Sequence, residues 1–152
     1  MLNKLELLVN DMHAIQNKIV LIVGTPQTGK TVLLKMLAKS LDTTPVNIGV
    51  AMGKCLSAMP QRQRPLEASS ILRELADQYT KNDLLLIDNI ELLFDHSLQL
   101  APIDLLKKNA QARRIVAVWP GELRDGRLTY AELGHPEYQE YATDGVIPFI
   151  IQ

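Results

Sequence analysis

The sequence predicts an α/β fold, a three-layer αβα sandwich built around a mostly parallel five-stranded sheet. Short apolar runs of strand length alternate along the chain with longer segments whose apolar residues recur at helical spacing. A glycine-bounded loop joins the first apolar run to the first of these longer segments. Alternating strands and helices imply parallel pairing, right-handed crossovers and helices on both faces of the sheet. We therefore expect a ligand at the carboxyl ends of the strands.

The first apolar run, residues 19–23, leads directly into Gly24-Thr-Pro-Gln-Thr-Gly-Lys30-Thr31. This segment fills every position of G-x-x-x-x-G-K-[ST], the phosphate-binding P-loop. Its two glycines take backbone angles that a side chain would obstruct, so successive N–H groups point at phosphate oxygens. Lys30 can reach the β- and γ-phosphates, and the Thr31 hydroxyl can ligate Mg²⁺. The predicted nucleotide-binding residues are Gly24, Thr25, Pro26, Gln27, Thr28, Gly29, Lys30, Thr31 and Val32.

The composition suits a single P-loop NTPase domain over residues 1–152. Leu5, Leu8, Val9 and other apolar residues share one helical face near the start of the chain, so residues 1–17 are predicted to be an N-terminal packing helix. Sixteen basic and 17 acidic residues leave a net charge of −1, which gives no reason to expect non-specific binding to nucleic acid or membranes. A lone cysteine and the absence of an eighteen-residue apolar run suggest a cytoplasmic protein without a membrane span.

After the P-loop helix, four elements are expected in order. Residues 46–50 alternate apolar and small or polar side chains, which predicts a short second strand, and residues 51–59 suit a short helix. Residues 60–65 form a basic loop bounded by prolines, and residues 66–79 read as a helix. The residues expected to share the packing face of that helix are Leu66, Ile71, Leu72, Leu75 and Tyr79.

A second chemical signal is the apolar run at residues 83–88, which ends in Asp88. A continuous apolar run is typical of a parallel strand that is covered on both faces. A carboxylate at the end of a strand adjoining the P-loop strand can hold Mg²⁺ through water, which is the Walker B role. Thr31 and Asp88 are therefore the predicted metal-binding residues, and Mg-ATP is the predicted ligand. ATP is preferred over GTP because the sequence contains no N-K-x-D motif.

The C-terminal third is less regular. Residues 103–110 suit a helix, and residues 114–119 form another buried-strand pattern that is stopped by Pro120-Gly121. The polar stretch at residues 122–145 is predicted to form loops and short helical turns. Residues 146–151 read as a last strand, although Pro148 is unusual within one.

The P-loop followed by the strand that ends in Asp88 resembles the ATPases of the AAA+ and origin-recognition type. Further segments are similar to the BrxF family, the small P-loop proteins of type 3 BREX phage-defence systems. Those segments are Val46-Asn-Ile-Gly-Val-Ala51, Arg62-Gln-Arg-Pro65, Trp119-Pro-Gly121, Leu128-Thr-Tyr130 and His135-Pro-Glu-Tyr138. The resemblance implies an ATP-binding subunit that acts as a slow ATPase or nucleotide switch. It also implies partners, which are a self-oligomer or other phage-defence proteins, with DNA as a further ligand to test.

The chain departs from an active AAA+ ATPase in three ways. Asn89 stands where a catalytic glutamate is usual, and an amide can orient water without accepting its proton. Trp119 occupies the polar sensor position, and the sequence stops before a C-terminal lid. Glu91 is a substitute acid, so the predicted catalytic residues are Lys30, Asp88, Asn89 and Glu91. An arginine acting in trans could be any of Arg113, Arg114, Arg124 and Arg127.

These departures leave open whether the protein hydrolyses ATP. If it does, we expect a weak nucleoside-triphosphate hydrolase. Two alternatives belong to other functional classes: a free-standing small-molecule phosphotransferase (kinase) and a non-hydrolysing DNA-binding adaptor. An arginine-rich lid that would exclude water from phosphoryl transfer is not evident in the sequence, which disfavours the kinase.

Overall fold

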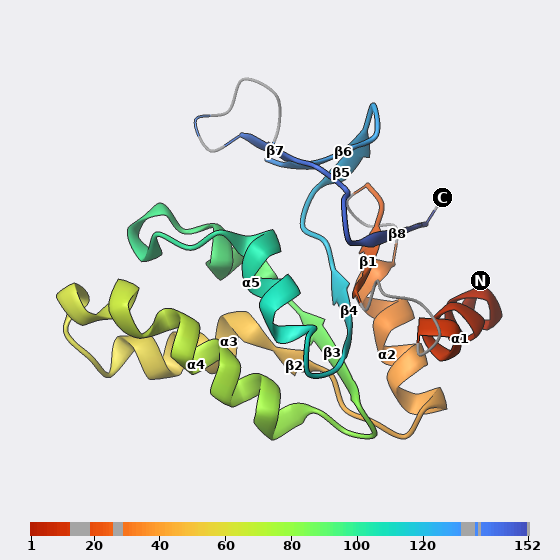
Figure 1. The fold of residues 1–152 in the computed structure, drawn as a ribbon, viewed down its shortest axis with the longest axis horizontal. Coiled ribbons are helices and arrows are strands. Elements are labelled where there is room, and N and C mark those ends of the chain that lie inside the picture. The colour runs from red at the N-terminus through yellow and green to blue at the C-terminus, as the bar shows by residue number, and fades with distance from the viewer. Residues whose placement is uncertain (13–18, 26–28, 132–135, 137, 152) are drawn as a thin grey trace.

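The computed structural model describes residues 1–12, 19–25, 29–131, 136 and 138–151 (Figure 1). It confirms the predicted α/β fold, with five parallel strands in the order β2-β3-β4-β1-β8. The strands of this sheet are β1 (Ile19–Val23), β2 (Val46–Asn47), β3 (Leu84–Asp88), β4 (Arg114–Val118) and β8 (Ile147–Ile150). The apolar runs at residues 19–23 and 83–88 therefore correctly predicted two strands, β1 before the P-loop and β3 ending in Asp88.

Helices cover both faces of the sheet. Side chains on alternate positions of β1 explain the three layers: Val20 and Ile22 pack with α1 and α2, whereas Ile19 and Leu21 pack with the helices of the opposite face. The helices are α1 (Leu2–Asp11), α2 (Lys30–Ser40), α3 (Ile48–Ser57), α4 (Arg64–Tyr79) and α5 (Pro102–Asn109). In the described part of the chain, none of them is long and apolar enough to cross a membrane.

The N-terminal helix packs against the P-loop helix. Leu5, Val9 and Met12 are fully buried in the same cluster as the apolar residues of α2. The Ser40 hydroxyl, at the far end of α2, donates a 2.6 Å hydrogen bond to Glu6 Oε1. Residues 13–17 of the predicted helix lie outside the described residues.

The strand predicted at residues 46–50 is much shorter. Only Val46 and Asn47 pair with β3, and α3 begins at Ile48. The reason is local, because Asn47 Oδ1 accepts a 3.0 Å hydrogen bond from the Val50 backbone N–H and so caps the new helix. A side-chain N-cap competes with strand pairing at this position, and the apolar alternation of Val46, Ile48 and Val50 did not reveal it.

The helix predicted at residues 66–79 begins earlier, at Arg64, with Pro65 in its first turn and a short 3₁₀ helix, η2 (Gln61–Gln63), before it. Ile71 and Leu72 are buried as expected. Leu66 is not on the packing face: 79% of it is exposed. It precedes Ile71 by five residues, which places it roughly 140° away around a helix of 3.6 residues per turn.

Residues 122–145, which were predicted to be loops and helical turns, contain a second, antiparallel sheet. Its strands are β5 (Glu122–Arg124), β6 (Arg127–Tyr130) and β7 (Gln139–Tyr141), and it lies above the carboxyl end of β4 in Figure 1. Asp125 and Gly126 both have positive φ angles, 53° and 76°, as a two-residue hairpin turn requires. The Asp-Gly pair was therefore the sequence signal that the prediction missed.

The last strand, β8, pairs with β1 at the edge of the main sheet, as Pro148 permits. The Ile151 N–H donates a 2.8 Å hydrogen bond to Val23 O. Because N–H groups alternate in direction along a strand, the Pro148 nitrogen points away from β1. A proline costs the sheet no hydrogen bond there, and it removes a donor that another chain could pair with.

Candidate nucleotide-binding site

Gly29 and the start of α2 have a geometry that suits phosphate binding. Gly29 caps α2 with φ +87° and ψ 26°, a left-handed conformation that favours glycine. A Cβ added at Gly29 would meet nothing within 4 Å, so conformation and not space demands a glycine. Helix α2 then begins at Lys30, with its positive end at the carboxyl edge of the sheet. Pro26, Gln27 and Thr28 lie outside the described residues, whereas Thr25 and Val32 are exposed beside this helix start.

Lys30 joins the P-loop to the neighbouring strand. Its Nζ donates hydrogen bonds to Gly24 O at 2.9 Å and to Trp119 O at 3.0 Å. Burial lowers the pKa of Lys30 below its ordinary value, and attraction from the Glu122 and Glu91 carboxylates opposes that effect. The amine is therefore a partly desolvated cation at the position where the P-loop pattern expects one.

Thr31 and Asp88 meet at the same edge of the sheet. Thr31 Oγ1 donates a 3.2 Å hydrogen bond to Asp88 Oδ1. Strand β3 does not adjoin β1, as the sequence had suggested, because β4 lies between them. The two side chains nevertheless converge, since parallel strands bring all their carboxyl ends to one edge.

These oxygens fit a magnesium–nucleotide complex. A hydroxyl and a carboxylate are ligands that Mg²⁺ prefers, and Mg²⁺ usually keeps several waters and phosphate oxygens in its coordination shell. Among the described residues, no three His, Cys, Asp or Glu side chains form a group that could hold a metal ion. The donor set therefore suits a cation that arrives with a nucleotide better than a resident structural metal.

Asn89 ties Asp88 to α3. It has a left-handed backbone, with φ 55°, and its N–H donates to Asp88 Oδ1 at 2.8 Å. Its side-chain Nδ2 donates to Asn47 Oδ1 at 3.0 Å, and its carbonyl accepts from the Gly49 N–H at 3.0 Å. A Cβ on Gly49 would lie 2.3 Å from Asn89 Nδ2, so a larger residue there would displace the Asn89 side chain. The predicted water-orienting amide is thus engaged with the start of α3.

Glu91 and Asn89 line one cleft together with Lys30, Thr31 and Asp88. Glu91 lies in a 3₁₀ helix, η3 (Ile90–Phe94), directly after the Asp88 strand, and its side chain is exposed. The cleft has a volume of about 390 Å³, and its opposite wall is formed by Val118, Trp119 and Pro120. The structure therefore brings together all four predicted catalytic residues.

Trp119 presents its backbone to the cleft while its indole ring is fully buried elsewhere. The ring Nε1 donates to Thr129 O in β6 at 2.9 Å. Phe94 and Tyr141 pack edge-on against the ring, with centroids 5.3 and 5.7 Å away. The side chain at the sensor position therefore anchors the small sheet, and only the Trp119 carbonyl reaches Lys30.

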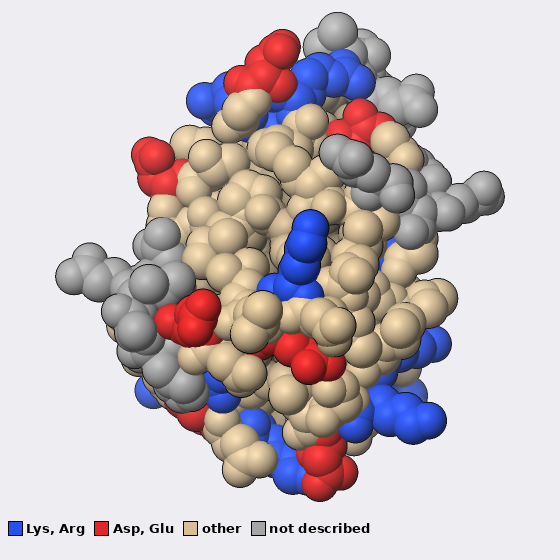
Figure 2. All heavy atoms as spheres, turned by 90° about the vertical axis from the view of Figure 1, so that its right-hand side faces the viewer, with Lys and Arg blue, Asp and Glu red and all other residues tan. Residues whose placement is uncertain are grey.

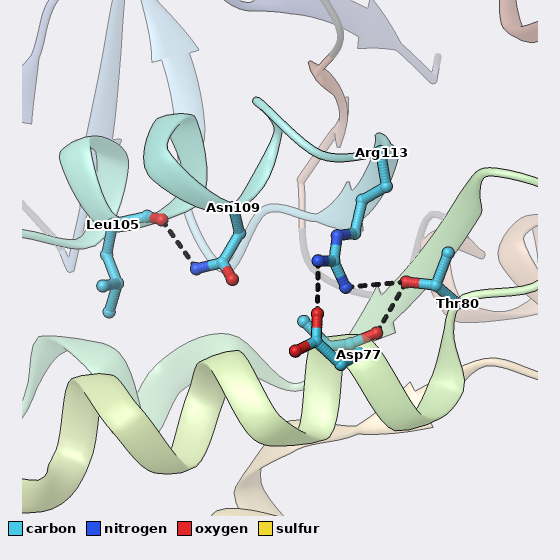
Figure 3. A network of polar contacts seen from close by, with 6 residues as sticks. Asp77, Thr80, Leu105, Asn109 and Arg113 are labelled. Atoms are coloured by element: carbon cyan, nitrogen blue, oxygen red, sulfur yellow. Dashed lines mark hydrogen bonds and ion pairs between the residues drawn. The ribbon is translucent and has the colours of Figure 1, made fainter.

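The structure divides the four arginines that were considered for a role in trans. Arg113 and Arg114 are buried where β4 begins, at the edge of the sheet away from the P-loop. Arg113 pairs with Asp77 at 2.5 Å and donates to Thr80 Oγ1 at 2.9 Å (Figure 3). Arg114 donates to the carbonyls of Val9 and Asn82. Both have structural roles in this chain.

Arg124 and Arg127 are exposed on the β5–β6 hairpin, beyond the P-loop edge of the sheet. Each lies near one carboxylate, Glu122 at 3.4 Å and Glu140 at 4.0 Å respectively. Of the four arginines, these two alone could reach a neighbouring molecule.

Glu122 was not singled out from the sequence, although its carboxylate influences the site without lining the cleft. It was assigned to a loop, but it begins β5 and its charge acts on the Lys30 amine. The only available signal was a carboxylate shortly after the end of the fourth apolar run, which is too common a pattern to select a residue.

Comparison with known proteins agrees with this geometry. A family model described as "ATPase family associated with various cellular activities (AAA)" matches residues 20–118, which include Lys30, Thr31 and Asp88. The structure of PCH-2 from C. elegans matches 99% of this chain with a TM-score of 0.51 and 19% sequence identity. The match covers 41% of the PCH-2 chain, so the present chain spans less than half of that length. No curated protein shows significant sequence similarity.

Proposed function

Because the chain belongs to the AAA family of ATPases, we propose that it binds Mg-ATP and acts as a slow ATPase or nucleotide switch within a phage-defence assembly. The family implies nucleotide binding. The observation that carries the proposal is the convergence of Lys30, Thr31 and Asp88 at the carboxyl edge of one parallel sheet. A kinase or adaptor would need a further substrate or DNA site, and the cleft itself supplies groups for phosphates and Mg²⁺.

Each group in the cleft has a separate task. The N–H groups of the P-loop and the start of α2 hold phosphate oxygens, and Lys30 adds a positive charge at the β- and γ-phosphates. Thr31 and Asp88 would hold the metal, Thr31 through its hydroxyl oxygen and Asp88 through its carboxylate. A bound Mg²⁺ supplies charge neutralisation for the phosphate oxygens.

Slow turnover follows from the way two further groups are used. The Asn89 amide donates to Asn47, and an amide cannot accept a proton from water. The Trp119 indole donates to Thr129 and is fully buried, so it gives the γ-phosphate no polar contact. Bound nucleotide is therefore positioned without the usual groups that stabilise its transition state.

We expect the isolated chain to hydrolyse Mg-ATP well below the roughly 1 to 10³ s⁻¹ of typical enzymes. Phosphate release under saturating Mg-ATP, with Lys30→Ala as the blank, measures this rate. The Asn89→Ala variant should keep the residual rate within a few-fold, because the amide is not the base. Brisk magnesium-dependent turnover by the isolated wild-type chain would contradict the proposal of a slow switch.

The assembly role is supported by the resemblance to BrxF-like defence proteins and by exposed apolar surface. Figure 2 shows the side that carries both chain ends: uncharged residues fill its upper middle, and one projecting basic side chain lies close to acidic side chains below it. An apolar groove of about 510 Å³ lies between α1, the start of α2 and the end of the chain, lined in part by Met1, Val32, Met36 and Ile151. Exposed apolar surface of this kind is typical of a protein contact.

We expect the assembly state to depend on the nucleotide. An ATP analogue that cannot be hydrolysed should favour a larger species than ADP does, because contacts to the γ-phosphate should change the position of the segments after Asp88 and Trp119. Mass photometry with each nucleotide and a pull-down from the native host measure this. Arg124→Ala and Arg127→Ala test a role of either arginine in trans. A variant that still forms the larger species but hydrolyses ATP more slowly would indicate such a role, whereas loss of the larger species would indicate a role in assembly. A strict monomer in both states, without a recovered partner, would favour the kinase.

A further inference from the structure

We propose that a polar pocket between α4 and α5 binds a sugar phosphate, at a site separate from the nucleotide cleft. The pocket has a volume of about 700 Å³, within the roughly 300–1,000 Å³ of small-molecule sites. Arg113, which lines it, directly precedes β4, whereas Val118 ends β4 and lines the cleft. The two sites therefore lie at opposite ends of one strand, and the ligand of the pocket cannot accept a phosphoryl group from a nucleotide in the cleft.

One wall of the pocket is a polar face of α4. Ser69, Arg73 and Asp77 follow one another at intervals of four residues, which places them along one face of the helix. The opposite wall comes from the end of α5 and the segment that leads into β4. Its polar lining residues are Lys108, Asn109, Gln111 and Arg113. Hydroxyl, amide and cationic groups thus line one space, which favours a ligand with several oxygen atoms.

Arg113 gives the pocket a fixed, buried cation. Its side chain is only 7% exposed, and its terminal nitrogens donate to Asp77 Oδ1 at 2.5 Å and to Thr80 Oγ1 at 2.9 Å. Figure 3 shows Arg113 and Asn109 extending toward α4, where Asp77 and Thr80 lie. The Arg113 Nε is also buried, but it has no hydrogen-bond partner among the described residues. A buried donor without an acceptor marks a place for water or a ligand, and an oxyanion suits a guanidinium group best.

The charges that line the pocket favour an anion. Arg73 and Lys108 are exposed on its two walls, and neither forms an ion pair within the described part of the chain. The carboxylate of Asp77 already pairs with Arg113. Basic side chains therefore outnumber acidic ones in this pocket, in a protein whose net charge is −1. A phosphate group can accept hydrogen bonds from guanidinium and ammonium groups at once.

The neutral groups of the pocket suit a sugar better than a base. The side chains of Ser69, Ser70 and Gln111 can each donate and accept hydrogen bonds, as sugar hydroxyls require. No aromatic side chain lines the pocket in the described part of the chain, whereas single-stranded nucleic acid is usually held by stacking of its bases on aromatic rings. The lining therefore disfavours a DNA strand and supports a sugar phosphate as the ligand class.

The test titrates the 152-residue chain with ribose 5-phosphate, inorganic phosphate and uncharged ribose, and follows binding by NMR. Ribose 5-phosphate should move the backbone signals of Ser69 and Lys108 and the Nε–H signal of Arg113. Inorganic phosphate should bind more weakly, and ribose should not bind detectably, because the charge carries most of the affinity. Since the P-loop also suits phosphate, the titration is repeated in Lys30→Ala, where the pocket signals should move as they do in the wild type.

Two variants test the charges without touching the buried arginine, which also ties α4 to β4. Arg73→Gln and Lys108→Gln should each weaken ribose 5-phosphate binding about tenfold, because each removes a charged hydrogen bond. Both residues are exposed, so neither change should unfold the protein. Lys107→Gln is the matched control: Lys107 is also in the last turn of α5 but does not line the pocket, so the affinity should stay within about twofold of the wild-type value.

Three results would overturn the proposal. The first is a folded wild-type chain whose pocket signals do not move at millimolar ribose 5-phosphate, or whose affinity both glutamine variants share. The second is inorganic phosphate that binds as tightly as ribose 5-phosphate, because the sugar would then contribute nothing. The third is tighter binding of a short thymidine oligonucleotide that depends on Arg73 and Lys108, which would assign the pocket to a nucleic-acid backbone.

Discussion

Replacing Lys30 with alanine is expected to weaken Mg-ATP binding by about 100-fold or more, since charged hydrogen bonds contribute about 1.5–3 kcal/mol each. The Lys30 amine lies within hydrogen-bond distance of carbonyls from two neighbouring strands, at the edge where the phosphates are expected. Isothermal titration calorimetry gives the affinity directly. Loss of the amine should not unfold the protein, because Lys30 is only partly buried.

Lys35→Ala is the matched control, because Lys35 is an exposed lysine on the same helix. It should bind Mg-ATP as the wild type does. Thermal denaturation adds a second readout: ligand at 100 times its Kd stabilises the wild type by about 2.7 kcal/mol, and this gain should vanish in Lys30→Ala. Equal ATP affinity in the wild type and a folded Lys30→Ala variant would show that the nucleotide does not bind in this cleft.

Much of the fold could be predicted because its central strands are buried on both faces. β1 occupies residues 19–23 as predicted, and the runs before Asp88 and Trp119 are also strands. The spacing of apolar residues did not predict the local structure where a helix cap or a turn determines it. Asn47 ends β2 by capping α3, and Asp125 with Gly126 makes a hairpin inside a polar stretch.

The residues of the site were likewise predicted only in part. Lys30 and Thr31 follow from spacing alone, and Asp88 follows from its place at the end of an apolar run. Contacts across long sequence separations could not be predicted: Lys30 and Trp119 are 89 residues apart. The order of strands decides such contacts, and a pattern within one segment carries no information about that order. The same limit hid the effect of the Glu122 charge on the pKa of Lys30.

Trp119 joins these two parts of the molecule, and Trp119→Ala is expected to lower the free energy of unfolding by about 3–5 kcal/mol. Its ring is fully buried among Phe94, Tyr141 and the start of the small sheet. Alanine would leave a cavity there and would leave Thr129 O without the Nε1 donor. Urea denaturation followed by circular dichroism measures the loss.

Trp119→Phe separates packing from hydrogen bonding at this position. Phenylalanine keeps most of the buried ring but lacks the indole N–H, so the expected loss is smaller, about 1–3 kcal/mol for the buried Thr129 carbonyl and the reduced volume. Because the Trp119 carbonyl also accepts from Lys30, we expect ATP affinity to fall in Trp119→Ala and to be largely kept in Trp119→Phe. A Trp119→Ala protein with wild-type stability and affinity would show that the small sheet does not hold the cleft in place.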